Sequence, residues 1–167
     1  YRKGWNGAGR GETIPADRLA YAALIYTAPT EAEAHAGAEK LLWYVTANKV
    51  LPQFSNPPGY VPVQANIHML KGGADPTTSA FKTTPSVETA IKSGLMMAGT
   101  PDQVHQQIKK FHDYVGGFGN LLLMGQAGFL EHDETVLGIR TFGREVLPRL
   151  QDLPKTLSSE AQVAAVA

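Results

Sequence analysis

The chain has 167 residues, no cysteine, and 15 basic against 15 acidic side chains, so its formal net charge is zero. A balanced charge argues against polyanionic partners, and we expect neither nucleic acid nor an anionic membrane surface as a ligand. No apolar run approaches the roughly 18 residues that cross a bilayer, and the lack of cysteine excludes disulfides and zinc–thiolate sites. We expect a cytoplasmic protein with one core of ordinary size.

The first residues predict the end of a helix. Residues 1–5 close into the glycine-rich run 7–11, and a start at Tyr1 rather than Met indicates a processed or truncated chain. The glycine run could suggest a nucleotide-binding loop, but no strand precedes it and no helix follows it. A flexible turn between a helix and a strand explains it better.

A strand and a capped helix are predicted next. The strand is expected over 19–27, and Thr30 and Glu33 then stand at the spacing of a capping box. The helix that begins there is expected to run to Leu51, because Pro52 is incompatible with a helix interior.

Residues 53–84 break the alternation of strands and helices. They are rich in proline and glycine, and connections beyond about 12–15 residues are usually functional or disordered. We expect an insertion that folds as a lid over the carboxyl ends of the strands. His68, flanked by Ile67 and Met69, is a candidate substrate contact in this segment.

The second half of the chain has the most regular pattern. A short helix over 86–93 leads to a strand over 95–98, and Thr100 and Gln103 form a second capping box. Pro101 stands at the first helical position, where its missing amide costs nothing. The helix then continues to residue 115.

One apolar stripe supports this helix, and two more elements follow it. The stripe consists of Val104, Ile108, Phe111 and Val115. A strand is predicted over 120–124 and a last helix over 135–150, with Pro148 bending or ending it. Residues 158–167 are expected to be a frayed tail.

Three strand–helix units of this kind predict an α/β fold with a parallel sheet. Three strands cannot close a sheet, so two architectures compete. The chain is either the C-terminal βα units of a (β/α)8 TIM-type barrel with a long irregular insertion, or a small flavodoxin-like domain, which needs about five strands. We favour the barrel portion over 1–157, with strands that are parallel and consecutive.

Candidate site residues lie where the strands end, since α/β enzymes bind ligands at that edge. Gly99 and Thr100 precede a helix whose free amides could hold a cofactor phosphate, unless Thr100 itself satisfies them. Gln126 could contact a cofactor. Met124 could face a cofactor ring or an apolar substrate, and is equally plausible as a core residue.

The histidines do not form a metal site. His105 and His112 are seven residues apart on one helix, whereas a helical metal pair needs a spacing of four, so we expect both to be solvated. His35 and His132 are expected to be structural. No nucleophile–base pair is visible, and the catalytic residues stay unknown.

Several segments together resemble the C-terminal part of the bacterial luciferase-like flavin-dependent monooxygenases. The runs 98–104, 116–124 and 142–150 follow one another in the order that this family shows, over about 55 residues. The strand 19–27 and the helix start at 30–34 are also similar to the family. Residues 52–84 and the tail carry little of the resemblance.

The resemblance implies an enzyme that uses reduced FMN, supplied by a separate flavin reductase, and O2 to oxidise a small apolar organic substrate. A deazaflavin, F420, serves related enzymes on the same barrel, and some family members are non-catalytic bracing subunits of a heterodimer. The family's main phosphate loop and catalytic histidine belong to the first half of the barrel and match no residue here. We therefore expect the parent protein to be the enzyme, with the missing N-terminal part of the barrel as partner. The chain alone should be inactive and should tend to form homo-oligomers.

Overall fold

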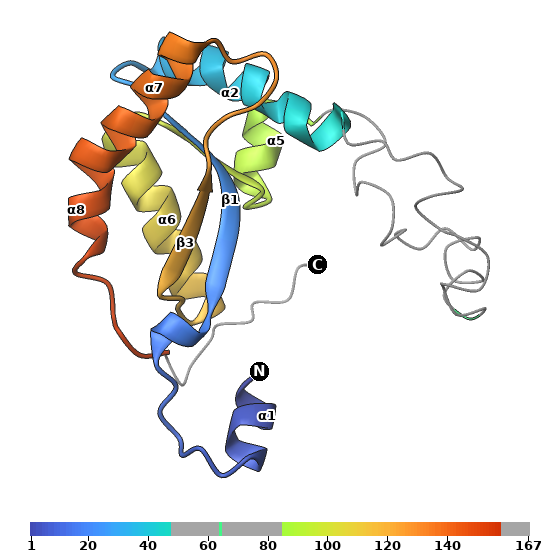
Figure 1. The fold of residues 1–167 in the computed structure, drawn as a ribbon, viewed down its shortest axis with the longest axis vertical. Coiled ribbons are helices and arrows are strands. Elements are labelled where there is room, and N and C mark those ends of the chain that lie inside the picture. Colours follow the sequence, from blue (N-terminus) through green and yellow to red (C-terminus); the bar gives the residue numbers. More distant parts are fainter. Residues whose placement is uncertain (48–63, 65–84, 158–167) are drawn as a thin grey trace.

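The protein is described by a computed structural model that covers residues 1–47, 64 and 85–157. A three-stranded parallel sheet lies at its centre, with helices packed against both faces (Figure 1). His68, the remainder of the expected lid and the tail 158–167 lie outside the described residues. The α/β fold with a parallel sheet is thus confirmed, and within the described residues the sheet does not close into a barrel.

The strands are β1 (Ala20–Thr27), β2 (Met96–Gly99) and β3 (Asn120–Met124). Both pairings are parallel, as predicted, but the order is β2-β1-β3, so the prediction of consecutive strands is wrong. The last five residues of β1 and all four residues of β2 are buried, whereas β3 is exposed at alternate positions. Burial alone therefore does not set the order, because β2 is fully buried although it lies at an edge of the sheet.

The helical elements follow the predicted order. They are α1 (Arg2–Gly7), η1 (Ala16–Arg18), α2 (Glu31–Ala47), α5 (Val87–Lys92), α6 (Pro101–Val115), α7 (His132–Thr141), the π-helix η2 (Phe142–Val146) and α8 (Leu147–Leu150). α7 begins three residues before the predicted start, because Glu131 and Glu134 form a capping box there. The predicted start at Thr135 came from the apolar stripe that begins at Val136, and glutamate is not among the residues that commonly cap a helix.

The two faces of the sheet bury separate cores. Leu24 and Tyr26 of β1 face α2 and α5, whereas Ala23 and Ile25 face α6 and η2. Helices on both faces and an order that begins 2-1-3 are typical of doubly wound sheets. The helices of a barrel, in contrast, all lie on its outer face.

The closing run of the chain contains a change of helix type. Across Phe142–Val146 the helix widens, and the amide of Leu147 bonds to the carbonyl of Phe142, five residues back. Pro148 has no amide to offer the carbonyl of Arg144, so the ordinary helical bond cannot form there. Pro148 thus neither ends nor sharply breaks the helix, which continues to Leu150.

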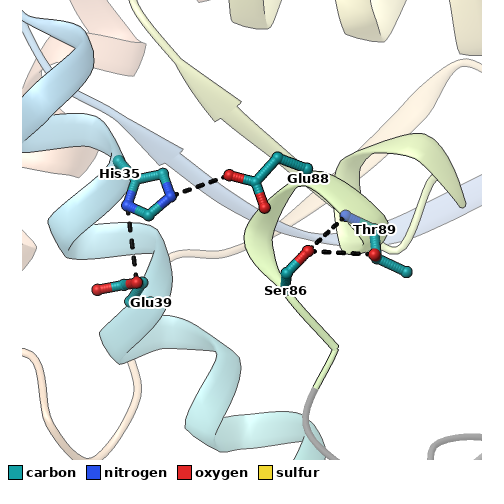
Figure 2. A network of polar contacts seen from close by, with 5 residues as sticks. All are labelled: His35, Glu39, Ser86, Glu88 and Thr89. Atoms are coloured by element: carbon teal, nitrogen blue, oxygen red, sulfur yellow. Dashed lines mark hydrogen bonds and ion pairs between the residues drawn. The ribbon is translucent and has the colours of Figure 1, made fainter.

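An exposed polar network joins α2 to α5 (Figure 2). His35 Nε2 lies 3.1 Å from Glu88 Oε1, and its Nδ1 lies 3.8 Å from Glu39 Oε1. Ser86 caps α5 by accepting a hydrogen bond from the Thr89 amide at 3.2 Å. Hydrogen bonds from the backbone amide of Glu88, from Ser86 and from His35 lower the pKa of the Glu88 carboxyl. His35 therefore has the structural role that was expected.

Candidate functional site at the carboxyl edge of the sheet

β1 and β2 end side by side and place two helix starts at one edge of the sheet. Thr27 is in register with Gly99, and the amide of Ala28 donates to the Gly99 carbonyl at 3.3 Å. α2 begins at Glu31 and α6 at Pro101, each within a few residues of its strand. Gly99 and Thr100 therefore lie beside the end of β1.

The start of α6 is occupied by its own side chains. The Thr100 amide donates to Gln103 Oε1 at 2.9 Å, and the Thr100 hydroxyl accepts a hydrogen bond from the Gln103 amide. Val104 already donates to the Thr100 carbonyl, and Pro101 has no amide. Of the first-turn donors that could hold a phosphate, these bonds leave only the amide of Asp102.

A carboxylate also lies at this helix start. Gln103 Nε2 donates to Glu31 Oε1 at 2.6 Å, which ties the beginning of α6 to that of α2. A negative charge next to the remaining donor opposes the binding of an anion. The described groups therefore lock two helices together and do not offer an anion pocket in this arrangement.

Gly99 is required by the capping turn. Its φ is +146°, and a Cβ atom at this position would lie 2.5 Å from Gln103 Oε1. Glycine is therefore the residue that lets Gln103 fold back onto the Thr100 amide. This local role explains Gly99 without a bound cofactor.

Thr27 carries the one buried side-chain polar atom without a partner at this edge among the described residues. Its side chain is fully buried, and its Oγ1 atom has no hydrogen-bond partner within the described residues. Thr27 pairs with Gly99 of β2 and lies three residues beyond the last pair between β1 and β3. Buried side-chain oxygens usually have a hydrogen-bond partner, so Thr27 is an exception among the described residues at this edge.

Met124 and Gln126 lie apart from Gly99. Met124 is in register with Leu24, three residues before the Thr27–Gly99 pair, which corresponds to about 10 Å along the sheet. Met124 is partly buried against the core that α2 covers, which favours the core role that was left open for it. Gln126 is exposed beyond the end of β3 and is free to contact a ligand.

A tyrosine clamp holds the helices over this edge, and the sequence analysis did not anticipate it. The ring of Tyr26 lies between Gly37 of α2 and Gly138 of α7, where Cβ atoms would approach it to 2.0 and 3.0 Å. Its hydroxyl donates to the Glu134 carbonyl at 3.0 Å, and Lys40 of α2 forms an ion pair with the Glu134 carboxylate. Glycines inside two predicted helices were the signal that could have revealed the clamp.

The ionisation of the clamp follows from its surroundings. Burial, reinforced by the carboxylates of Glu134 and Glu33, raises the pKa of the Tyr26 phenol above 10.0. The hydrogen bond from Lys40, followed by that from the Glu131 amide, lowers the pKa of the Glu134 carboxyl. Both shifts favour the neutral phenol and the ionised carboxyl that the contacts need.

The remaining histidines serve packing and the surface. His112 is buried, with its Nε2 atom unpartnered within the described residues, so the expectation that it is solvated is wrong. It is covered because the ring of Phe118 packs edge-on against it at 5.2 Å. His105 Nδ1 lies 3.1 Å from an Arg149 nitrogen, and His132 is exposed at the start of α7.

Two further observations restrict what the described part of the chain can bind. Across 1–47 and 85–157 no group of three or more potential metal ligands comes together. No helix among these residues is both long and apolar enough to cross a bilayer.

A cavity of about 470 Å³ lies at the opposite edge, next to the amino ends of β1 and β3. The sequence did not predict it. Its lining combines residues that precede β1 and β3 with others from β3, α6, η2, α8 and the segment after α8; Ile108, Phe118, Phe142, Leu147, Leu153 and Lys155 are among them.

Comparison with known proteins gives a likeness to a solved structure. No family model and no curated protein matches the chain. Among solved structures it is similar to a monooxygenase, RslO1 from Streptomyces bottropensis, with a TM-score of 0.55 and 17% sequence identity. The match covers 89% of this chain and 35% of that one, so the chain spans about a third of that protein's length. At this identity the likeness shows a shared fold.

Proposed function

We propose that this chain is part of a flavin-dependent monooxygenase of the luciferase-like type, which uses reduced flavin and O2 to oxidise a small apolar organic substrate. One observation carries the proposal: the fold matches that of a protein named a monooxygenase over 89% of the chain. The ordered motifs at 98–104, 116–124 and 142–150 resemble the same class of enzyme and support the proposal from sequence.

The described residues do not fit a flavin by themselves. The amides at the start of α6 are engaged by its capping box, and Glu31 adds a negative charge there. A flavin phosphate needs several free donors in one place. We therefore assign the flavin site, and the catalytic groups, to the remainder of a longer protein. In that protein FMN would be the cofactor and a separate reductase its supplier.

The part that this chain plays is positional. The Tyr26 clamp and the bond between Gln103 and Glu31 fix α2, α6 and α7 around the carboxyl edge. The exposed Gln126 is the group that it can present toward a ligand, whereas the unpartnered Thr27 hydroxyl is fully buried. Rigid elements that hold such groups in place are what an enzyme needs around a cofactor-based reaction.

A closed barrel in the longer protein would require two rearrangements: β3 would leave β1 to pair with β2, and the helices that cover the two faces would all come to lie on the outer face. In a (β/α)8 barrel β3 follows β2 directly. In the structure the carboxamide of Gln107 occupies the outer edge of β2, where it accepts from the Ala98 amide and donates to the Ala98 carbonyl. Closure of the barrel would replace both of these hydrogen bonds with backbone hydrogen bonds between β2 and β3. Hydrogen exchange at the Ala98 amide in the chain and in the longer protein reports this change.

The test of the function is a titration of the 167-residue chain and of the longer protein with oxidised FMN, reduced FMN and F420. We expect stoichiometric binding of reduced FMN, with O2 consumption, by the longer protein alone. Binding of F420 alone would replace FMN in the proposal. Tight FMN binding with turnover by the 167-residue chain would contradict the assignment of the flavin to other residues.

A second function is favoured by the self-capped start of α6. A βα unit with no free anion site suits a non-catalytic subunit that braces a partner barrel. In that case the longer protein would bind neither flavin, and it would instead stabilise a catalytic partner. Sedimentation of the longer protein with and without such a partner separates the two functions.

A further inference from the structure

The cavity at the amino edge of the sheet is framed by elements that are tied together. The Ala16 amide donates to the Lys155 carbonyl at 2.9 Å, and the Leu157 amide donates to the Ile14 carbonyl at 2.9 Å. Pro15 and Thr156 form an antiparallel bridge between these bonds. The segment after α8 is therefore a fixed wall of the cavity.

The interior of the cavity is apolar. Ile108, Phe118 and Phe142, which are almost fully buried, line it, whereas Leu147 is 45% exposed at its side. Small-molecule sites have volumes of roughly 300–1,000 Å³ and mostly apolar linings. The cavity, at about 470 Å³, has the size for a small molecule and is too small for a folded partner.

Two charged side chains line the cavity, Asp17 and Lys155, and they differ in whether a neighbouring charge compensates them. Asp17 lies 3.8 Å from the guanidinium of Arg18, which compensates its charge. Lys155 has no acidic partner among the described residues, and no other lysine or arginine lines the cavity there. An available ammonium beside an apolar chamber selects a ligand with an anionic end.

We propose that this cavity binds a small apolar carboxylic acid, with its hydrocarbon body against Phe118 and Phe142 and its carboxylate at Lys155. The site lies at the edge of the sheet opposite the candidate functional site. It requires neither flavin nor oxygen chemistry, so its test is independent of the proposed function.

The experiment uses three ligands of one shape and different charge: 4-phenylbutyrate, 4-phenylbutan-1-ol and 4-phenylbutylamine. Binding to the 167-residue chain is measured by isothermal titration calorimetry. We expect one site per chain, with the carboxylate binding two- to fivefold more tightly than the alcohol, as an exposed ion pair allows. The amine should bind most weakly.

Variants identify the site. Lys155→Glu should weaken 4-phenylbutyrate binding about three- to tenfold and remove the preference for the carboxylate, and Lys155→Arg should restore it. Lys110→Glu makes the same charge change on an exposed part of α6 and serves as the matched control. Leu153→Trp, which fills the cavity, should abolish binding of all three ligands, while circular dichroism shows that the fold is kept.

The result can overturn the proposal in two ways. Absence of saturable binding by the folded wild-type chain would do so. Equal effects of Lys155→Glu and Lys110→Glu would show that long-range charge, and not this cavity, attracts the carboxylate.

Discussion

The carboxamide of Gln107 and the backbone of Ala98 exchange two hydrogen bonds, of 3.0 Å from the amide and 2.9 Å to the carbonyl. The Leu24 and Ala28 amides bond to the carbonyls of Leu95 and Gly99, so the odd-numbered residues of β2 form the ladder with β1. The backbone N–H and C=O groups of Ala98 therefore point away from β1, to the outer edge of the sheet. Gln107 imitates a neighbouring strand there and covers an edge that could otherwise pair with another chain.

Gln107→Ala is expected to lower the free energy of unfolding by about 1–2 kcal/mol, because it leaves an amide and a carbonyl without partners. Urea denaturation measures the change. Gln107→Glu should have an intermediate effect, since a carboxylate can accept from Ala98 but cannot donate. Gln106→Ala, at an exposed neighbour on the same helix, is the control. Equal stabilities for the variants at 106 and 107 would show that the edge contact contributes nothing.

Gly37→Ala is expected to destabilise the fold by about 1–3 kcal/mol, although alanine is the better helix former. The new methyl group would lie 2.0 Å from the Tyr26 ring. Gly143→Ala is the matched control, because its Cβ would meet nothing within 4 Å. Thermal unfolding of both variants checks the prediction. A more stable Gly37→Ala variant would mean that the ring and helix separate easily.

Stability is expected to fall as the pH rises above about 10, the ordinary pKa of tyrosine. The pKa of Tyr26 is raised in the folded state, chiefly by burial. The unfolded chain therefore loses this proton first, and the contribution present below pH 10 is lost as the pH rises through the folded-state pKa.

Tyr26→Phe should flatten this alkaline decline, measured as the melting temperature from pH 8 to 11, because no proton is left to lose. Tyr114→Phe, at an exposed tyrosine, should leave the decline as in the wild type. Tyr21, whose pKa burial also raises, keeps part of the slope in both variants. If the two variants declined alike, the clamp would not control the alkaline transition.

Self-association through β3 is the last prediction. β3 pairs only with β1 within the described residues, and its Leu122 side chain is 52% exposed. An open strand edge with an exposed apolar residue tends to pair with another strand. Leu122→Lys should therefore lower the fraction of oligomers in sedimentation velocity. Ile139→Lys, which changes an equally exposed residue of α7, should leave it unchanged.

Local signals in the sequence predicted the elements well. The capping box of Thr100 and Gln103, with Pro101 after it, placed the start of α6 correctly, because all of its bonds lie within one turn. The Thr30 hydroxyl likewise accepts from the Glu33 amide, at 3.3 Å. Boundaries that depend on such short-range chemistry can be derived without a structure.

The arrangement of the elements could not be derived in the same way. The order of the strands depends on pairings between residues far apart in the sequence, and the short apolar runs of β1, β2 and β3 are alike. His112 stands four residues after Ile108, on the buried stripe of α6, but its polar side chain argued for the surface, and the packing of Phe118 against it could not be read from the sequence. The candidate site could not be predicted for the same reason. It depends on the order and register of the strands, and the register separates Met124 from Gly99.

The hydrogen bond between Leu157 and Ile14 has a consequence for how this unit can be handled and how it could have been exchanged during evolution. The chain enters the sheet region after Ile14 and leaves it before Leu157, and the two residues are joined by this hydrogen bond, so entry and exit lie side by side (Figure 1). A segment whose two ends meet can be inserted into, or removed from, a host chain without stretching the host. Residues 14–157 therefore have the geometry of a transferable cassette, and a short linker across this junction would allow the unit to be circularly permuted.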